Sequence, residues 1–157
     1  MKHVQIFDGL FSVEEVKYVH ECYRKFLYKR TEVDREGLPY TGLSCELDFK
    51  DPIVKMLIER TKINPSPLLR AYINLFLKDE KPYFHQDNVN KGYKTLLYYM
   101  NPQSKDFNNL GETFFYIDNE IRCVEPAPGR VVIFDAEIWH RASSLRDHDR
   151  YTIALKW

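Results

Sequence analysis

The second half of the chain is a series of short apolar segments separated by turns, and this pattern constrains the fold more than any other feature. Six segments rich in β-branched and aromatic residues follow residue 68: "LRAYINLFLK", "KTLLYYM", "ETFFYID", "EIRCVEP", "GRVVIFD" and "RYTIALKW". Turn sequences such as "NPQSKDFNNLG", "DNE" and "PAPG" separate most of them. Short strands at this spacing are typical of a β-sandwich or jelly roll.

The first part of the chain has helical periodicity instead. In "SVEEVKYVHECYRKFLYK", Ser12 and Glu15 have the spacing of a capping box, and apolar residues recur at helical intervals. The expected buried stripe of this helix consists of Val16, Val19, Tyr23, Phe26 and Leu27. A second helix is predicted from Asp51-Pro52 through "IVKMLIER", because Asp is a good N-cap and Pro is favoured at the first helical position.

Together these patterns predict an α+β protein with a mainly β core. The 157 residues suit a single domain, and the 44% hydrophobic content suits a globular one. We expect a helical support over about 1–62 and a jelly-roll core over about 69–157. The helices precede the strands, so they are expected to pack outside the sheet.

Composition argues against several classes of protein, although a local basic patch remains compatible with a neutral chain. The formal net charge is zero, which argues against a surface built to bind nucleic acid. The three cysteines are far apart and form no C-x-x-C, so neither a disulfide framework nor a structural zinc site is expected. No apolar run has the length of a signal peptide or a membrane span. A cytoplasmic location is therefore expected, and the oligomeric state stays open.

The segment between the two expected helices, "TEVDREGLPYTGLS" (31–44), is predicted to be a loop. It is rich in charged residues, Gly and Pro. A loop of this length in a small protein is often functional, so it is a candidate lid, and Tyr40 is a candidate substrate contact. The alternative is an ordinary surface loop with an exposed tyrosine.

The stretch "PYFHQDNVN" contains a candidate metal site. If "YFHQD" is extended, His85 and Asp87 point to the same side. His140, in "VVIFDAEIWHRAS", follows far enough along the chain for intervening strands to bring it back beside them. Two imidazoles and one carboxylate form the ligand set of non-haem Fe(II) oxygenases. The alternative is a surface His and a turn Asp, with His140 in the core or at its rim.

A candidate anion anchor lies in the last segment. Arg150 and Thr152 alternate on "RYTIALKW", so they face the same side. A guanidinium suits bidentate binding of a carboxylate, and a nearby hydroxyl adds a second donor. Tyr99, in "TLLYYMN", shares a face with Thr95 and is a further candidate if that face lines the interior. An exposed arginine and a core tyrosine are the alternatives.

In the order His85-Gln86-Asp87, "TLLYYMN", "GETFFY", "PAPGRVVIFD", His140 and "RYTIAL", the chain resembles the 2-oxoglutarate/Fe(II)-dependent dioxygenases, in particular their prolyl 4-hydroxylase-like branch. The resemblance implies a double-stranded β-helix. It also implies iron ligation by the two histidines and Asp87.

For the cosubstrate, the resemblance implies that Arg150, Tyr99 and Thr152 hold the distal carboxylate of 2-oxoglutarate. Asn74 falls where related dioxygenases have an Asn that contacts the cosubstrate. The implied cofactors are Fe(II), 2-oxoglutarate and O2, with ascorbate as a possible reductant.

The implied activity is hydroxylation of a C–H bond, with decarboxylation of 2-oxoglutarate to succinate. The expected substrate is a peptidyl proline or an amino acid. Tyr83, Trp139 and Arg141 flank the metal ligands and are candidate substrate contacts, with core packing or solvent exposure as the alternative. A dioxygenase of nucleic acid or a small molecule, and a non-enzymatic jelly-roll binding module, remain alternative functions.

Overall fold

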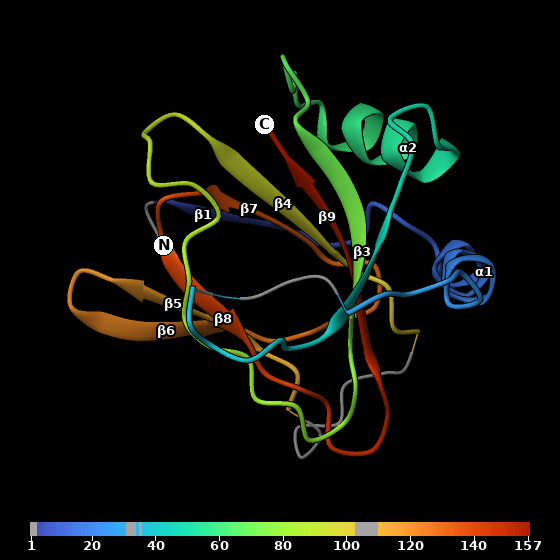
Figure 1. The fold of residues 1–157 in the computed structure, drawn as a ribbon. Coiled ribbons are helices and arrows are strands. Elements are labelled where there is room, and N and C mark those ends of the chain that lie inside the picture. Colours follow the sequence, from blue (N-terminus) through green and yellow to red (C-terminus); the bar gives the residue numbers. More distant parts are fainter. Residues whose placement is uncertain (1–2, 31–33, 35, 103–109) are drawn as a thin grey trace.

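We describe the protein from a computed structural model that covers residues 3–30, 34, 36–102 and 110–157. It is mainly β, with two helices (Figure 1). The elements of the described residues are β1 (Val4–Phe7), α1 (Val13–Tyr23), β2 (Leu43–Glu46), α2 (Pro52–Thr61), β3 (Arg70–Phe76), β4 (Lys94–Tyr99), β5 (Thr113–Ile117), β6 (Glu120–Val124), β7 (Val131–Asp135), β8 (Trp139–Ala142) and β9 (Arg150–Lys156). All six strand-like segments of the sequence are strands.

The strands form two antiparallel sheets. The larger has the order β1-β7-β4-β9-β3-β2, and the smaller has the order β6-β5-β8. Strands far apart in the sequence are neighbours: β9, the last strand, lies between β3 and β4. This arrangement places the last strand, which carries Arg150, at the centre of the larger sheet.

Two hydrophobic clusters cover the two faces of the larger sheet. One joins both helices to outward-facing strand residues such as Tyr98, Ile153 and Leu155. The other lies between the two sheets and includes Leu97 and Tyr99 from β4 with Phe115 from β5. Alternate residues of one strand therefore serve different clusters, as the period-two geometry of a strand requires. Tyr99 faces the space between the sheets, as the sequence predicted for one face of β4.

The helix starts follow the predicted capping chemistry. Ser12 Oγ accepts from Glu15 N (3.2 Å), and Glu15 Oε2 accepts from Ser12 N (2.8 Å), which completes a capping box. At α2 the Asp51 carboxylate accepts from Ile53 N, and Pro52 occupies the first turn. Both caps satisfy amides that would otherwise lack partners.

The first helix is shorter than predicted. It ends at Tyr23, so Phe26 (41% exposed) and Leu27 (78% exposed) do not belong to its buried stripe. The Tyr28 hydroxyl donates to the carbonyl of Tyr23 (2.8 Å), and Lys29 forms a β-bridge with Ser44. The segment after Tyr23 therefore makes a local side-chain hydrogen bond and a bridge to β2 in place of another helical turn.

The predicted loop 31–44 is also shorter than expected, because its last two residues begin β2. Ser44 pairs with Asn74 of β3 and with Lys29, so this end of the segment is part of the larger sheet. Residues 31–33 and 35 lie outside the described residues, so the prediction of a lid stays a prediction. Most of the predicted turn "NPQSKDFNNLG", from 103 to 109, also lies outside them.

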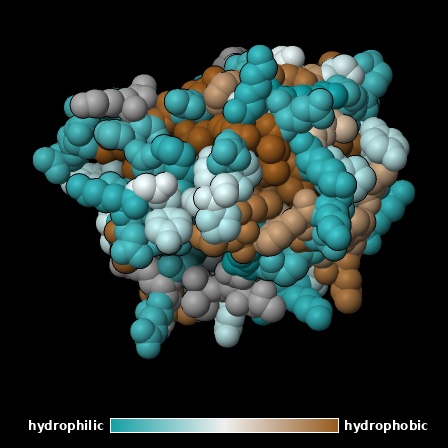
Figure 2. All heavy atoms as spheres, turned by 90° about the horizontal axis from the view of Figure 1, so that it is seen from above, coloured by the Kyte–Doolittle hydropathy of each residue, from teal (hydrophilic) through white to brown (hydrophobic). Residues whose placement is uncertain are grey.

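No helix of the described residues is long and apolar enough to cross a membrane. The face seen from above in Figure 1 exposes hydrophobic surface between hydrophilic side chains (Figure 2). Apolar area of this kind is ordinary on a small protein, because polar atoms cannot cover its whole surface.

Candidate active site

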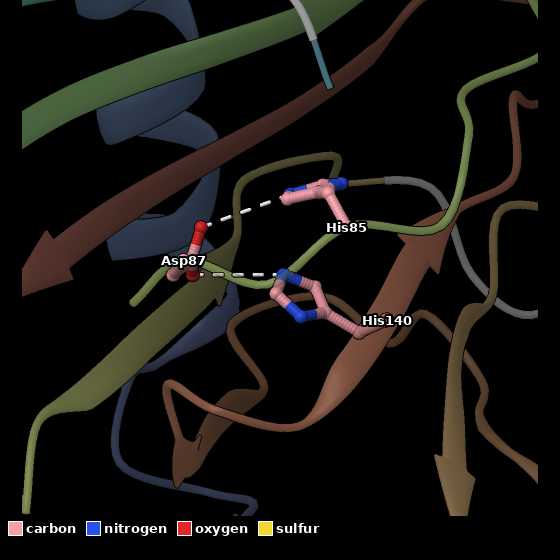
Figure 3. A group of neighbouring side chains, drawn as sticks. All are labelled: His85, Asp87 and His140. Carbon is pink, nitrogen blue, oxygen red and sulfur yellow. Dashed lines mark ion pairs between the residues drawn. The ribbon is translucent and has the colours of Figure 1, made fainter. Parts of the chain in front are cut away.

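The structure brings the three predicted metal ligands together. His85 and Asp87 lie on the connection between β3 and β4, and His140 lies on β8 (Figure 3). His85 and His140 form an isolated antiparallel bridge, with both N–H···O distances at 2.9 Å. One potential ligand atom from each of the three side chains lies within 4.8 Å of the others.

Backbone carbonyls orient both imidazole rings. Nδ1 of His140 lies 2.8 Å from the carbonyl of Ile138, and Nδ1 of His85 lies 3.1 Å from the carbonyl of Tyr83. A carbonyl can only accept, so each Nδ1 carries a proton and Nε2 is the ring atom that remains for a metal. Both Nε2 atoms face Asp87, at 3.7 Å from its Oδ1 (His85) and 3.5 Å from its Oδ2 (His140). This is the tautomer and orientation that metal ligation requires.

The charge state of the group also fits a divalent cation. Burial alone would raise the pKa of Asp87, but His140, Lys156 and His85 hold it below its usual range, so the carboxylate is ionised. Burial lowers the pKa of His140 to about 4, so its ring is neutral near pH 7. Two imidazoles and one carboxylate on one side of a metal leave its other positions open, as in non-haem Fe(II) oxygenases.

Three further residues surround these ligands, and sequence reasoning missed them. Thr95 Oγ1 donates to Asp87 Oδ2 (2.6 Å), and Lys156 Nζ lies 2.8 Å from Asp87 Oδ1. Asp34 Oδ1 lies 3.2 Å from Nδ1 of His85, and Asp34 Oδ2 accepts from the backbone of Tyr83 (2.7 Å).

For Lys156 and Thr95, the alternation of side chains along a strand could have indicated a place near the site. Lys156 is on the same face of β9 as the predicted anchor residues, and Thr95 is on the same face of β4 as Tyr99. Asp34 gave no comparable signal, since it lies in an irregular segment far from His85 in the sequence.

The predicted anion anchor is buried between the sheets. Arg150 is 2% exposed, and burial lowers its pKa. Its Nε donates to the carbonyl of Gly111 (3.0 Å) and its Nη2 donates to Thr113 Oγ1 (3.0 Å). The hydroxyl of Tyr99 lies 2.6 Å from the same Thr113 oxygen. Within the described part of the chain, no carboxylate lies within ion-pair distance of Arg150.

These features fit an external carboxylate. A buried cation without a counter-ion is costly, and an anionic ligand removes that cost. Thr152, two residues along β9, is 1% exposed, and its hydroxyl has no hydrogen-bond partner among the described residues. Asn74 is the backbone partner of Thr152 on β3 and is half-buried. Tyr99, Arg150 and Thr152 therefore lie together as predicted, and their role as cosubstrate ligands stays a prediction.

The candidate substrate residues lie in different places. Tyr83 lies two residues before His85 and is 36% exposed. Trp139 and Arg141 flank His140 on β8, so their side chains are on the face of the smaller sheet opposite the imidazole. The guanidinium of Arg141 stacks on Phe114 (4.5 Å from the ring centroid), outside the space between the sheets.

Arg141 and Phe114 line a surface cleft of about 690 Å³ on that outer side. Tyr40 is 53% exposed, and its carbonyl accepts from Arg30 (3.2 Å). The structure therefore does not bring the side chains of Trp139 or Arg141 to the predicted metal ligands. Among the described residues, Tyr40 has no recorded contact with these ligands either.

Comparisons with known proteins agree with this geometry. No protein-family profile and no curated protein matches the sequence. Solved structures do match: the fold is that of prolyl hydroxylases and other 2-oxoglutarate-Fe(II) oxygenases. The resemblance seen in the sequence is thus confirmed at the level of the fold.

Three of the similar structures illustrate the range. One is a prolyl hydroxylase from Trichoplax adhaerens in complex with a peptide of hypoxia inducible factor (16% identity, TM-score 0.76, 98% of this chain and 82% of that chain). The second is a prolyl-4-hydroxylase from Pseudomonas putida (15% identity, TM-score 0.75, 99% of this chain and 92% of that chain). The third is HygX from Streptomyces hygroscopicus with nickel and 2-oxoglutarate bound (14% identity, TM-score 0.73, 98% of this chain and 82% of that chain).

Proposed function

We propose that the protein is a non-haem Fe(II)- and 2-oxoglutarate-dependent dioxygenase with a double-stranded β-helix core. One observation carries the proposal: the same fold contains a group of side chains that could hold a metal and a buried arginine, Arg150, without a carboxylate partner among the described residues. One of the similar structures has nickel and 2-oxoglutarate bound. His85, Asp87 and His140 hold Fe(II). Arg150 holds the distal carboxylate of 2-oxoglutarate, with Thr152, Tyr99 and Asn74 as its neighbours.

Each residue has a defined task in this proposal. Bound Fe(II) and 2-oxoglutarate supply the activation of O2, with release of succinate and CO2 and hydroxylation of a substrate C–H bond. The histidines and Asp87 fix the metal on one side and leave the other positions for ligands. Arg150 orients the cosubstrate through a charge-assisted pair of hydrogen bonds, and Thr152 donates the hydrogen bond that its hydroxyl lacks in the protein alone.

The proposed substrate is a peptidyl proline or another amino-acid residue. The similar structures include prolyl hydroxylases, and one of these is in complex with a peptide. The neutral net charge gives no support to nucleic acid as the substrate. Incubation with proline-containing peptides and detection of a one-oxygen mass increase tests this part separately.

The reaction is tested by oxygen-dependent formation of succinate from 2-oxoglutarate with added Fe(II). No second substrate is needed, because enzymes of this type turn over their cosubstrate slowly without one. We expect activity in the wild type, none in His85→Ala, and a KM for 2-oxoglutarate raised about 100-fold or more in Arg150→Met, because two charge-assisted hydrogen bonds are lost.

Arg150→Lys is the matched variant, since it keeps the charge but not the planar guanidinium group. Its KM for 2-oxoglutarate should lie between those of the wild type and Arg150→Met. Arg122→Ala, on the exposed edge strand β6, is the control and should behave like the wild type. A wild-type protein that forms no succinate and binds no 2-oxoglutarate in the presence of metal would contradict the proposal and favour the binding-module alternative.

A further inference from the structure

A lysine ammonium group lies directly against the metal-binding carboxylate. Lys156, the last residue of β9, has its Nζ 2.8 Å from Asp87 Oδ1. Its side chain is only 20% exposed, and the ammonium also lies 5.1 Å from the ring centroid of Tyr72. The proposed reaction assigns no task to a cation at this position.

Lys156 has no other acidic partner in the described part of the chain. The short distance between Nζ and Asp87 Oδ1 is that of an ammonium–carboxylate ion pair. Two other cations line the same small cavity of about 80 Å³, and each has its own carboxylate outside the metal group. Arg70 pairs with Glu46, and Lys94 pairs with Asp135 at 2.6 Å. Of these three carboxylates, only Asp87 would bind both a lysine ammonium group and a metal ion.

The same contact restrains the carboxylate. Oδ1 of Asp87 is held by Lys156, and Oδ2 accepts the hydrogen bond of Thr95 (2.6 Å). With a partner on each oxygen, the carboxylate cannot turn freely about its last torsion. Its oxygens thus keep their positions opposite Nε2 of His85 and Nε2 of His140 before any metal is bound.

We propose that Lys156 is a positioning residue of the metal centre, which holds Asp87 in place and lowers the affinity of the centre for divalent cations. The second effect follows from Coulomb repulsion, because an ammonium group and a divalent cation would share one partly buried carboxylate. The inference rests on the proposed function only in its use of the metal centre, and it does not depend on the substrate.

Metal binding can be measured without turnover. Isothermal titration calorimetry with Co²⁺, in the absence of 2-oxoglutarate, gives the dissociation constant for the wild type, Lys156→Met and Lys156→Gln. We expect both variants to bind Co²⁺ at least tenfold more tightly, because both lack the charge. Lys94→Met is the matched control: Lys94 lines the same cavity but pairs with Asp135, so its constant should stay within twofold of the wild type.

The positioning effect has its own readout, the visible absorption spectrum of bound Co²⁺. Lys156→Met leaves Asp87 Oδ1 without its donor, so the carboxylate can bind with both oxygens and the spectrum should change. Lys156→Gln keeps a donor, so its spectrum should remain close to that of the wild type. If Lys156→Met does not fold, Lys156→Gln alone decides the effect of the charge on metal affinity.

The outcomes separate the two proposals. Equal or weaker Co²⁺ binding by folded Lys156→Gln would overturn the inference and leave the proposed function intact. A wild-type protein that binds no Co²⁺ would overturn the proposed function, and the inference with it. Tighter binding in both variants, with an altered spectrum only in Lys156→Met, is the result that the structure leads us to expect.

Discussion

Individual polar atoms in the interior define the candidate site. Arg150 and Thr152 are both almost completely buried, yet the guanidinium has no carboxylate partner and the hydroxyl has no partner at all among the described residues. Buried polar groups are normally satisfied, because an unmade hydrogen bond costs about 1–3 kcal/mol. The guanidinium does donate to Gly111 and Thr113, so of this pair only the Thr152 hydroxyl is unsatisfied. An unsatisfied hydroxyl beside a buried cation on one strand face indicates a place for an anionic ligand rather than packing that serves stability.

Thr152→Val should separate binding from stability. Valine has the same shape and removes a hydroxyl that has no partner, so the free energy of unfolding should stay the same or rise by about 1 kcal/mol. The dissociation constant for 2-oxoglutarate, measured with Co²⁺ present, should rise about tenfold, because one hydrogen bond to a charged group is lost.

Thr113→Val is the matched comparison. Thr113 Oγ1 already accepts from Arg150 and contacts the Tyr99 hydroxyl, so valine leaves buried donors without partners. This variant should lose about 1–3 kcal/mol of stability in urea unfolding. A Thr152→Val protein that is destabilised as much as Thr113→Val would mean that the Thr152 hydroxyl has a structural partner.

Among the elements, the two helices are joined by one charged pair. Glu15, in the first turn of α1, completes the capping box and also accepts two hydrogen bonds from Arg60 of α2 (2.6 and 2.9 Å). These contacts, led by the hydrogen bonds from Arg60, lower the pKa of Glu15 to about 2.

The lowered pKa predicts an acid dependence of stability. Below about pH 4.5 the unfolded chain protonates Glu15, whereas the folded protein does so only near pH 2. The stability that Glu15 contributes is therefore fully present above pH 4.5 and is lost as the pH falls toward 2. Urea midpoints of the wild type and Glu15→Gln should differ most at pH 6 and converge near pH 2.

Glu14→Gln, in the same helical turn, is the control, because Glu14 is exposed. Its urea midpoint relative to the wild type should change much less between pH 6 and pH 2. A constant difference between the wild type and Glu15→Gln over this range would mean that the charge of Glu15 does not stabilise the fold.

At the scale of the whole molecule, the proposed metal centre joins separate parts of the fold. Two ligands come from the β3–β4 connection and the third from β8 of the smaller sheet. A metal bound to all three holds these segments together in the folded state only. Binding to the folded state alone stabilises a protein by about 2.7 kcal/mol when the free ligand is at 100 times its dissociation constant.

Divalent metal should therefore raise the thermal midpoint of the wild type, and a chelator should lower it again. His140→Ala should abolish the increase, whereas His3→Ala should keep it, because His3 pairs with Asp135 away from the three ligands. Differential scanning fluorimetry with and without Co²⁺ measures both. An equal increase in His140→Ala would show that the metal binds elsewhere.

Much of this site could be predicted from the sequence, for a local reason. Successive side chains of a strand point to opposite faces, so the i, i+2 spacing of Arg150 and Thr152 already placed this pair on one side of β9. The segment with His85 and Asp87 is a connection with one isolated bridge rather than a strand, yet both side chains still reach the same group. The capping chemistry of Ser12, and of Asp51 before Pro52, is also local. The matching order of motifs supplied the expected fold.

The remaining features depended on contacts between distant segments. The bridge of Lys29 with Ser44 ties the segment after the first helix to the larger sheet, and Asp34 lies beside His85, about fifty residues away in the sequence. The contact of Lys156 with Asp87 depends on β9 lying beside β4, a pairing that joins the last strand to one more than fifty residues earlier. By itself the sequence determined which side chains share a face, because that follows from backbone geometry. Only the tertiary structure decided which faces meet, because strand order and register are set by packing over the whole chain.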